Sequence, residues 1–331
     1  MTTTTPRSGH TQVRPPFDPE LAAALALVRE QIPPSLTPDL IGPMREGNDL
    51  MAVTLEMLSR EGTVEVSERE VPGPEGDPDV SLLILKPRGV VSGAPIIYHT
   101  HGGGMIVGDN RTGVDGPLDW AVESGAIVVS VEYRLAPEHP DPAPVEDCYA
   151  GLVWTHAHAA ELGGDPDRIL IAGASAGGGL AAGVALLARD RQGPPLIGQV
   201  LMCPMIDDRN ETPSSHELDG EGIWDRTSND TGWDALLGDR RKTDAVSVYA
   251  APSRAIDLSG LPPVFVDVGS VETFRDEDVD YAVRLWRAGV QAELHVWPGG
   301  FHGFDMFAPQ AAVSQMSIST RAAWVRRLLA T

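Results

Sequence analysis

Short apolar runs recur along the chain and are separated by longer stretches with helical periodicity. Several of the runs are continuous rather than alternating, as in Ile127-Val128-Val129 and Val264-Phe265-Val266. Strands that are apolar on both faces are typical of a mostly parallel sheet with helices on either side. The pattern predicts eight strands, at Val64–Val71, Val80–Lys86, Pro95–Thr100, Ala126–Glu132, Arg168–Ala172, Gly198–Cys203, Pro263–Val268 and Ala292–Trp297. The first two, joined by a turn-rich segment, are expected to form an antiparallel hairpin at one edge.

The segments between these strands have the spacing of helices. Helices are predicted at Leu21–Ile32, Asp49–Arg60, Val145–Leu162, Ala176–Arg191, Asp276–Ala288 and Val313–Leu329. The alternation of strands and helices favours one large α/β domain, made of residues 56–206 and 261–331. The polar stretch Met1–Glu20, rich in Thr and Pro, is expected to be disordered.

Two segments lie outside this alternation, residues 1–55 and residues 207–260. The second is polar and acidic, has no strand pattern, and is too long for a plain connection between two core strands. Trp224 and Trp233 within it favour burial over a disordered surface loop. The segment is therefore expected to form a lid or cap.

Charge and composition narrow the range of functions. The 331 residues carry a formal net charge of −22, and Lys86 and Lys242 are the only lysines. Such an acidic surface makes nucleic acids and membrane surfaces poor partners. No apolar run reaches the ~18–20 residues of a membrane span, and Leu21–Val28 follows acidic residues rather than the basic region of a signal peptide. Cys148 and Cys203 form neither a disulfide framework nor a zinc cluster, so a reducing, cytoplasmic compartment and no metal are expected.

A candidate nucleophile lies where a predicted strand meets a predicted helix. Gly173-Ala174-Ser175-Ala176-Gly177 matches G-x-S-x-G. A serine on such a tight turn needs neighbours with small side chains, and the N-terminus of the following helix favours the negative charge that develops on attack. The alternative is a glycine-rich turn without chemistry.

A second glycine-rich segment, His101-Gly102-Gly103-Gly104, follows the strand Pro95–Thr100. Glycines allow backbone N–H groups to turn toward an oxyanion. A phosphate loop would be expected to open a helix and to have a lysine nearby, and this segment has neither. The amides of Gly103, Gly104 and Ala176 are the predicted oxyanion donors.

A serine nucleophile needs a base and a group that orients the base. His302 lies on a glycine-flanked loop just after the last predicted strand and is the predicted base. The acid is expected after the strand Pro263–Val268, which gives the chain order Ser, acid, His. Asp276 and Glu277 in this stretch have the character of a helix start.

Together these motifs resemble the hormone-sensitive-lipase branch of the α/β-hydrolases. The matching stretches are HGGG at His101–Gly104, EYRLAPEHP at Glu132–Pro140, GASAGGGL at Gly173–Leu180, ETFRDE at Glu272–Glu277 and FHGF at Phe301–Phe304. The resemblance implies an α/β-hydrolase fold and places the acid at Glu272, where the family usually has Asp. Asp276 and the strand residue Asp267 are the alternatives.

The resemblance also implies an activity. A Ser175, Glu272, His302 triad would hydrolyse short- to medium-chain acyl or aryl esters through an acyl-enzyme, without a cofactor. A lactone hydrolase or amidase with the same triad is the alternative. The plant gibberellin receptors keep the fold as binding modules but have lost the base, which His302 supplies here. The family further implies that residues 1–55 and 207–260 form one helical cap, and that two copies pair as a homodimer.

Overall fold

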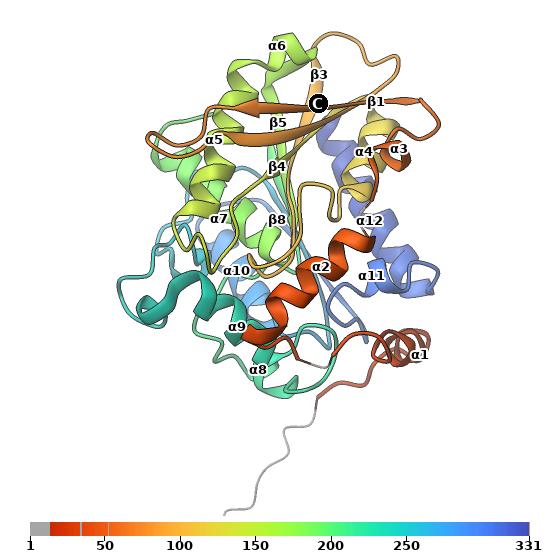
Figure 1. Ribbon diagram of the computed structural model, residues 1–331, viewed down its shortest axis with the longest axis vertical. Coiled ribbons are helices and arrows are strands. Elements are labelled where there is room, and N and C mark those ends of the chain that lie inside the picture. Colours follow the sequence, from red (N-terminus) through yellow and green to blue (C-terminus); the bar gives the residue numbers. More distant parts are fainter. Residues whose placement is uncertain (1–13, 34, 52, 331) are drawn as a thin grey trace, which may run out of the picture.

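A single eight-stranded sheet runs through the molecule (Figure 1). The computed structural model describes residues 14–33, 35–51 and 53–330. The strands are β1 Val64–Val71, β2 Val80–Pro87, β3 Ala94–Thr100, β4 Ile127–Glu132, β5 Gly164–Ala174, β6 Gly198–Met202, β7 Val264–Gly269 and β8 Ala292–Trp297. All eight predicted strands are therefore confirmed.

The strand order is β1-β2-β4-β3-β5-β6-β7-β8. β1 and β2 pair antiparallel at one edge, as their turn-rich connection predicts, and β2 is also antiparallel to β4. The remaining strands are parallel, so their carboxyl ends meet along one edge of the sheet. Ligands of open parallel sheets bind at this edge.

Successive residues of a strand face opposite sides of the sheet, and each side has its own core. In β3, Ile96 and Tyr98 contribute to one core and Ile97 to the other. The helices of the first core are α5 Ala143–Ala157, α7 Ala176–Asp190 and α10 Arg275–Arg287, and those of the second are α4 Asp115–Ser124 and α12 Ala312–Leu329. Figure 1 shows α5 and α7 to the left of the sheet and α4 and α12 to its right. The predicted α/β sandwich with helices on both faces is confirmed.

The two segments outside the alternation lie together in one layer, called the overlying layer, which is the described part of residues 1–55 together with residues 207–260. Its helices are α1 Pro19–Val28, α2 Ile41–Met51, α8 Pro213–Glu217 and α9 Arg226–Leu237. The short α3, Leu55–Leu58, packs instead against β1 and the second core. The Ser35 hydroxyl donates to Asp225 Oδ2 at 2.6 Å, and the Leu36 amide donates to Ser228 Oγ at 2.8 Å. Trp233 is fully buried, as its sequence context predicts. Figure 1 shows α2, α8 and α9 in the lower part of the view.

Some predicted boundaries are wrong. In place of the helix expected at Asp49–Arg60 there are two helices, α2, which starts at Ile41, and the short α3. Thr54 Oγ1 caps α3 by accepting from the Met57 amide at 3.1 Å. Pro43 lies in the first turn of α2, where its missing N–H costs no hydrogen bond. α4, between β3 and β4, was not predicted. The helix expected at Val145–Leu162 is broken at His158, which leaves α5 and the short α6, Ala159–Leu162.

The expectation that Met1–Glu20 is disordered is also wrong for its described part, residues 14–20. Residues 1–13 lie outside the described residues. Phe17 packs edge-on against Phe301, and the Asp18 amide donates to Gly299 O at 3.2 Å. Asp18 Oδ1 then caps α1 by accepting from the Glu20 amide at 2.9 Å. Among the described residues, no helix has the length and apolar character required to cross a bilayer.

Candidate functional site

Ser175 occupies the sharp turn between β5 and α7. Its φ of 57° and ψ of −124° lie in a region that L-residues rarely adopt. The amide of Ser175 donates to Met202 O at 2.8 Å, and its carbonyl accepts from the Met205 amide at 2.9 Å. A Cβ on the nearby Gly177 would lie 2.1 Å from Thr100 O, so this turn requires glycine there. The sequence therefore holds the serine in a strained position that neighbouring strands enforce.

The strain at Ser175 gives a testable stability difference. Ser175→Gly should unfold at higher denaturant concentration than Ser175→Ala, by about 1 kcal/mol, because glycine tolerates positive φ and alanine does not. Equilibrium denaturation of the two variants measures it directly. Equal stabilities would mean that the turn stores no strain.

The glycine-rich segment lies beside this turn. Gly103 and Gly104 have φ values of 112° and 62°. A Cβ would lie 2.0 Å from Val107 O at Gly103 and 2.3 Å from Trp224 Cη2 at Gly104, so neither position accepts a side chain. Among the described residues, the amides of Gly103, Gly104 and Ala176 donate to no acceptor. Three free N–H donors at one edge of the sheet are the requirement for an oxyanion hole.

Buried contacts fix the glycine-rich segment from behind. The His101 ring stacks on Tyr133 with centroids 4.0 Å apart, and the Tyr133 hydroxyl donates to His101 O at 2.8 Å. Burial lowers the pKa of His101 to about 4, so this imidazole is neutral near pH 7. From α2, Arg45 Nε donates to Ile106 O at 2.7 Å and its Nη2 to Ala136 O at 2.8 Å. The overlying layer is thereby tied to the turn that follows the glycines.

His302 and Glu272 form a direct pair. His302 Nδ1 lies 2.9 Å from Glu272 Oε1, which also accepts from the Phe274 amide at 3.3 Å. The Glu272 side chain is fully buried and that of His302 is 12% exposed. Phe274 meets the imidazole edge-on, with centroids 5.4 Å apart. The Glu272 carboxylate and the Phe274 ring together hold the imidazole in one orientation.

The loops that carry these two residues are bound to each other. The Ser270 amide donates to Trp297 O at 2.8 Å, and the Val271 amide donates to Gly300 O at 2.9 Å. A Cβ on Gly269 would lie 2.1 Å from Gly300 O, so the approach is too close for any other residue. These contacts fix the loop after β7 against the loop that carries His302.

The alternative acids have other partners. Asp276 Oδ2 accepts from the Ser214 amide at 2.8 Å, in the overlying layer. Asp267 lies within β7 and pairs with Arg321 at 2.7 Å. Of the three acids considered, Glu272 alone contacts His302 among the described residues.

The serine and the histidine share neighbours but no hydrogen bond. Within residues 14–33, 35–51 and 53–330, the Ser175 hydroxyl forms no hydrogen bond with His302. Met202 and Cys203 connect them, because Met202 O accepts from the Ser175 amide while Cys203 Sγ, a Glu272 carboxylate oxygen and a His302 ring nitrogen lie within 4.8 Å of one another. Contacts between catalytic groups are often long without substrate and shorten when it binds.

Two residues at the site were not assigned to it from the sequence. Trp224 covers Gly104, and its ring centroid is 6.3 Å from that of His302. Cys203 follows β6, the strand next to β5. The strand order, which the sequence does not state, places Cys203 next to the serine strand, and the packing of residues 207–260 places Trp224 there.

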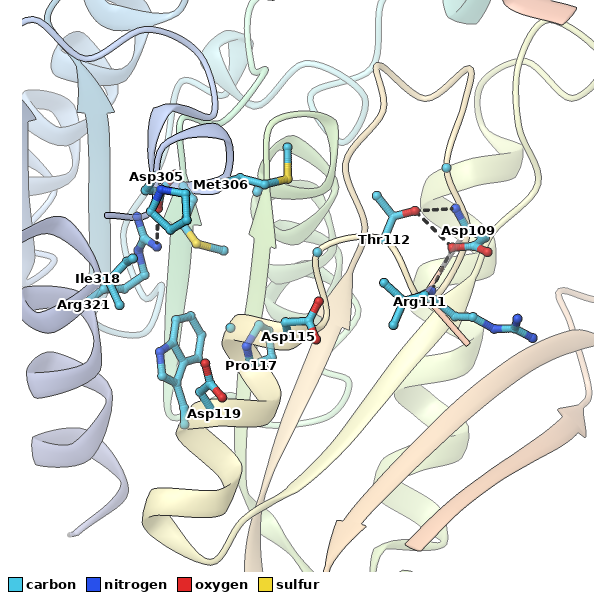
Figure 2. Close-up of a pocket in the computed structure, with 18 of the residues that line it drawn as sticks. Asp109, Arg111, Thr112, Asp115, Pro117, Asp119, Asp305, Met306, Ile318 and Arg321 are labelled. Atoms are coloured by element: carbon cyan, nitrogen blue, oxygen red, sulfur yellow. Dashed lines mark hydrogen bonds and ion pairs between the residues drawn. The ribbon is translucent and has the colours of Figure 1, made fainter. Parts of the chain in front are cut away.

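A cleft of about 1110 Å³ opens beside the site. Ala174 and Met202 contribute to its wall, but Ser175, Glu272 and His302 do not line it. Figure 2 shows Asp115 and Asp119 on α4 across from Asp305, Met306, Ile318 and Arg321, which come from the chain's last two helices, α11 (Phe304–Phe307) and α12. The cleft therefore extends from a rim of charged side chains to Ala174, the residue before the serine.

Glu132 in this cleft gives a pH-dependent stability. Burial raises its pKa from 4.5 to about 7, against the hydrogen bond that Glu132 Oε2 accepts from the Asn110 amide at 2.7 Å. The folded state thus binds the proton more tightly than the unfolded chain, so the parent loses stability as pH rises from about 4.5 to 7. Relative to the parent, Glu132→Gln should gain up to ~3 kcal/mol over that range, measured by denaturation at each pH.

A matched control for this measurement is Glu123→Gln, in the same cleft. Glu123 is exposed, so its variant should follow the parent at every pH. A stability difference between Glu132→Gln and the parent that does not change with pH would contradict the prediction.

The chain is similar to known proteins in sequence and in structure. The family described as having the alpha/beta hydrolase fold matches residues 97–306. The carboxylesterase NlhH of Mycobacterium tuberculosis is 41% identical over 245 residues, which are 73% of this chain and 76% of the relative. The arylesterase of Saccharolobus solfataricus is 33% identical over 213 residues, 63% of this chain and 68% of the relative.

A similar solved structure covers nearly the whole chain. The bacterial heroin esterase superposes with a TM-score of 0.87 at 40% identity, covering 95% of this chain and 98% of the other. The sheet order, the serine turn and the matches in sequence agree with one another. The chain belongs to the α/β-hydrolase family, in its hormone-sensitive-lipase-like branch of carboxylesterases.

Proposed function

We propose that this protein is a carboxylic ester hydrolase in which Ser175, His302 and Glu272 act as nucleophile, base and orienting acid. The observation that carries the assignment is the 2.9 Å contact between His302 Nδ1 and Glu272 Oε1, at the sheet edge that also presents the strained Ser175. Membership of a carboxylesterase branch supports the same activity. A binding module would not need an oriented imidazole beside a serine turn.

In the proposed reaction, Glu272 holds the proton of the imidazole on Nδ1 and leaves the lone pair on Nε2 free. His302 takes the Ser175 proton as the serine oxygen attacks the ester carbonyl. The amides of Gly103, Gly104 and Ala176 stabilise the oxyanion, and His302 then protonates the leaving alcohol. Water repeats the sequence on the acyl-enzyme, so the steps need no cofactor and no metal.

The overlying layer is proposed to be the cap of this site. Trp224 supports this, because the layer places its indole against Gly104 and close to His302. The side chain occupies space next to the proposed oxyanion donors, which favours short acyl groups. A homodimer and a cytoplasmic location, both expected from the sequence, stay predictions.

Removing the indole should change substrate preference. Trp224→Ala should raise kcat/KM for a long acyl chain relative to a short one by about tenfold or more, since each methylene group in an apolar pocket is worth roughly 10- to 200-fold. A series of 4-nitrophenyl esters of increasing acyl length measures it. Trp233→Phe, at a buried tryptophan on α9, is the control and should keep the parent's preference.

Covalent labelling tests the proposed function. A fluorophosphonate should react with the intact protein and add its mass to the peptide that contains Ser175, because only an activated serine reacts at a useful rate. Rates on paired ester, lactone and anilide substrates then separate an esterase from a lactone hydrolase or an amidase. Absence of labelling together with absence of ester hydrolysis would overturn the proposal.

A further inference from the structure

A cysteine that the proposed reaction does not use lies against the Glu272–His302 pair. Cys203 Sγ, one Glu272 carboxylate oxygen and one His302 ring nitrogen are all within 4.8 Å of one another. The cysteine is partly exposed, and its amide is fixed by donation to Asp267 O at 2.7 Å. Thiolate, imidazole and carboxylate are the ligands that Zn²⁺ binds in proteins, and soft thiolates also select heavier ions such as Cd²⁺.

A second observation is that one carboxylate oxygen at this position has no hydrogen-bond partner among the described residues. Glu272 Oε2 is buried and finds no hydrogen-bond partner among the described residues, although Oε1 has two. Both carboxylate oxygens of Asp278, which is fully buried on α10, likewise lack partners within that part of the chain. A cation at this position would give the free Glu272 oxygen a partner.

We propose that Cys203, Glu272 and His302 form a binding site for a thiophilic divalent cation, Zn²⁺ or Cd²⁺, that reversibly inhibits the enzyme. Tetrahedral coordination places such donors roughly 3.3–3.8 Å from one another. The three ligand atoms already lie within 4.8 Å of one another, so small side-chain movements are enough to bring them into place. Metal–sulfur bond formation releases the thiol proton to solvent, and no electron transfer is involved.

The inhibition follows from the ligands that the cation takes. A bound ion removes Glu272 from the imidazole and fixes His302 away from its role as a base, so proton transfer from Ser175 stops. This effect on rate rests on the proposed function, whereas binding of the cation does not. Arg321 pairs with Asp267 and Asp305, at 2.7 and 3.0 Å, and in the described part of the chain no hydrogen bond or ion pair joins it to the three ligands.

Titration with CdCl₂ tests the site, with a phosphine in place of a thiol reductant. The parent protein should develop the ultraviolet charge-transfer absorption of a cadmium–thiolate bond and lose ester hydrolysis over the same concentration range, and EDTA should reverse both. Cys203→Ser should lose the absorption and need more than about 100-fold higher Cd²⁺ for the same inhibition, because a missing first ligand costs more than a missing supporting partner. Cys203→Ala repeats the test if the serine variant folds poorly.

The chain offers a matched control in its second cysteine. Cys148 lies on α5 and is fully buried in the core, so Cys148→Ala should keep both the absorption and the inhibition of the parent. His302→Ala should weaken the absorption, which is read without any turnover, so binding is tested even if the protein hydrolyses no ester. No thiolate absorption in the parent, or an absorption that survives in Cys203→Ser, would overturn the site. Absorption without any loss of hydrolysis in an active enzyme would overturn the inhibition.

Discussion

Ser175→Ala should lower kcat for a chromogenic ester by a factor on the order of 10⁶, to the residual rate that the oxyanion donors and substrate binding support. The serine oxygen is the only atom of the proposed triad that bonds to substrate, so its removal also makes the base and the oriented acid useless. Loss of the nucleophile alone therefore costs about as much as loss of the whole triad. Steady-state rates on 4-nitrophenyl acetate, with enzyme concentration raised to detect residual turnover, measure this.

The fold should survive this change. The Ser175 amide donates to Met202 O and the Ser175 carbonyl accepts from the Met205 amide, and neither contact needs the hydroxyl. Alanine keeps the Cβ and the positive φ, so circular dichroism and the denaturation midpoint should match the parent closely. A correctly folded Ser175→Ala protein with near-parent activity would remove this serine from the mechanism and leave the family assignment intact.

The core of the fold could be predicted from the sequence because it is encoded locally. Continuous β-branched runs such as Ile127-Val128-Val129 have few alternatives to a strand covered on both faces. The overlying layer is different, since its helices are short and are stabilised by contacts far away along the chain. Ser35 with Asp225 and Arg29 with Gly220 O are examples, and neither leaves a periodic pattern. The misplaced start of α2 has the same origin.

The candidate site divides in a similar way. Ser175 and the glycines at 103 and 104 were predictable because a backbone with positive φ restricts which residues can occupy it. The acid that pairs with His302 was harder to predict, because several carboxylates follow β7 and the loop geometry decides which one faces the ring. Trp224 and Cys203 reach the site from other loops. Their roles depend on strand order and on packing across the sheet edge, which local patterns do not contain.

Glu272→Gln should lower kcat by about 10⁴ with little change in stability. The amide has nearly the shape of the carboxylate, but the Oε1 position faces both the Phe274 amide and His302 Nδ1, so an NH₂ group placed there points at the ring. A donor at this position stabilises the tautomer that carries the proton on Nε2, which cannot accept the proton of Ser175. The loss should appear in kcat rather than in KM, because Glu272 is fully buried behind the imidazole and does not touch substrate.

Asp276→Asn is the matched control, because it makes the same chemical change four residues further along the chain. Asp276 accepts from the Ser214 amide and pairs with Arg275 Nε at 2.8 Å, so its loss should cost less than about 1 kcal/mol of stability and leave kcat within a few-fold of the parent. The reverse outcome, a large loss in Asp276→Asn and none in Glu272→Gln, would move the acid to the second position. That result would also mean that the 2.9 Å contact orients the imidazole for packing alone, and that a Glu after β7 cannot replace the shorter Asp usual in this branch.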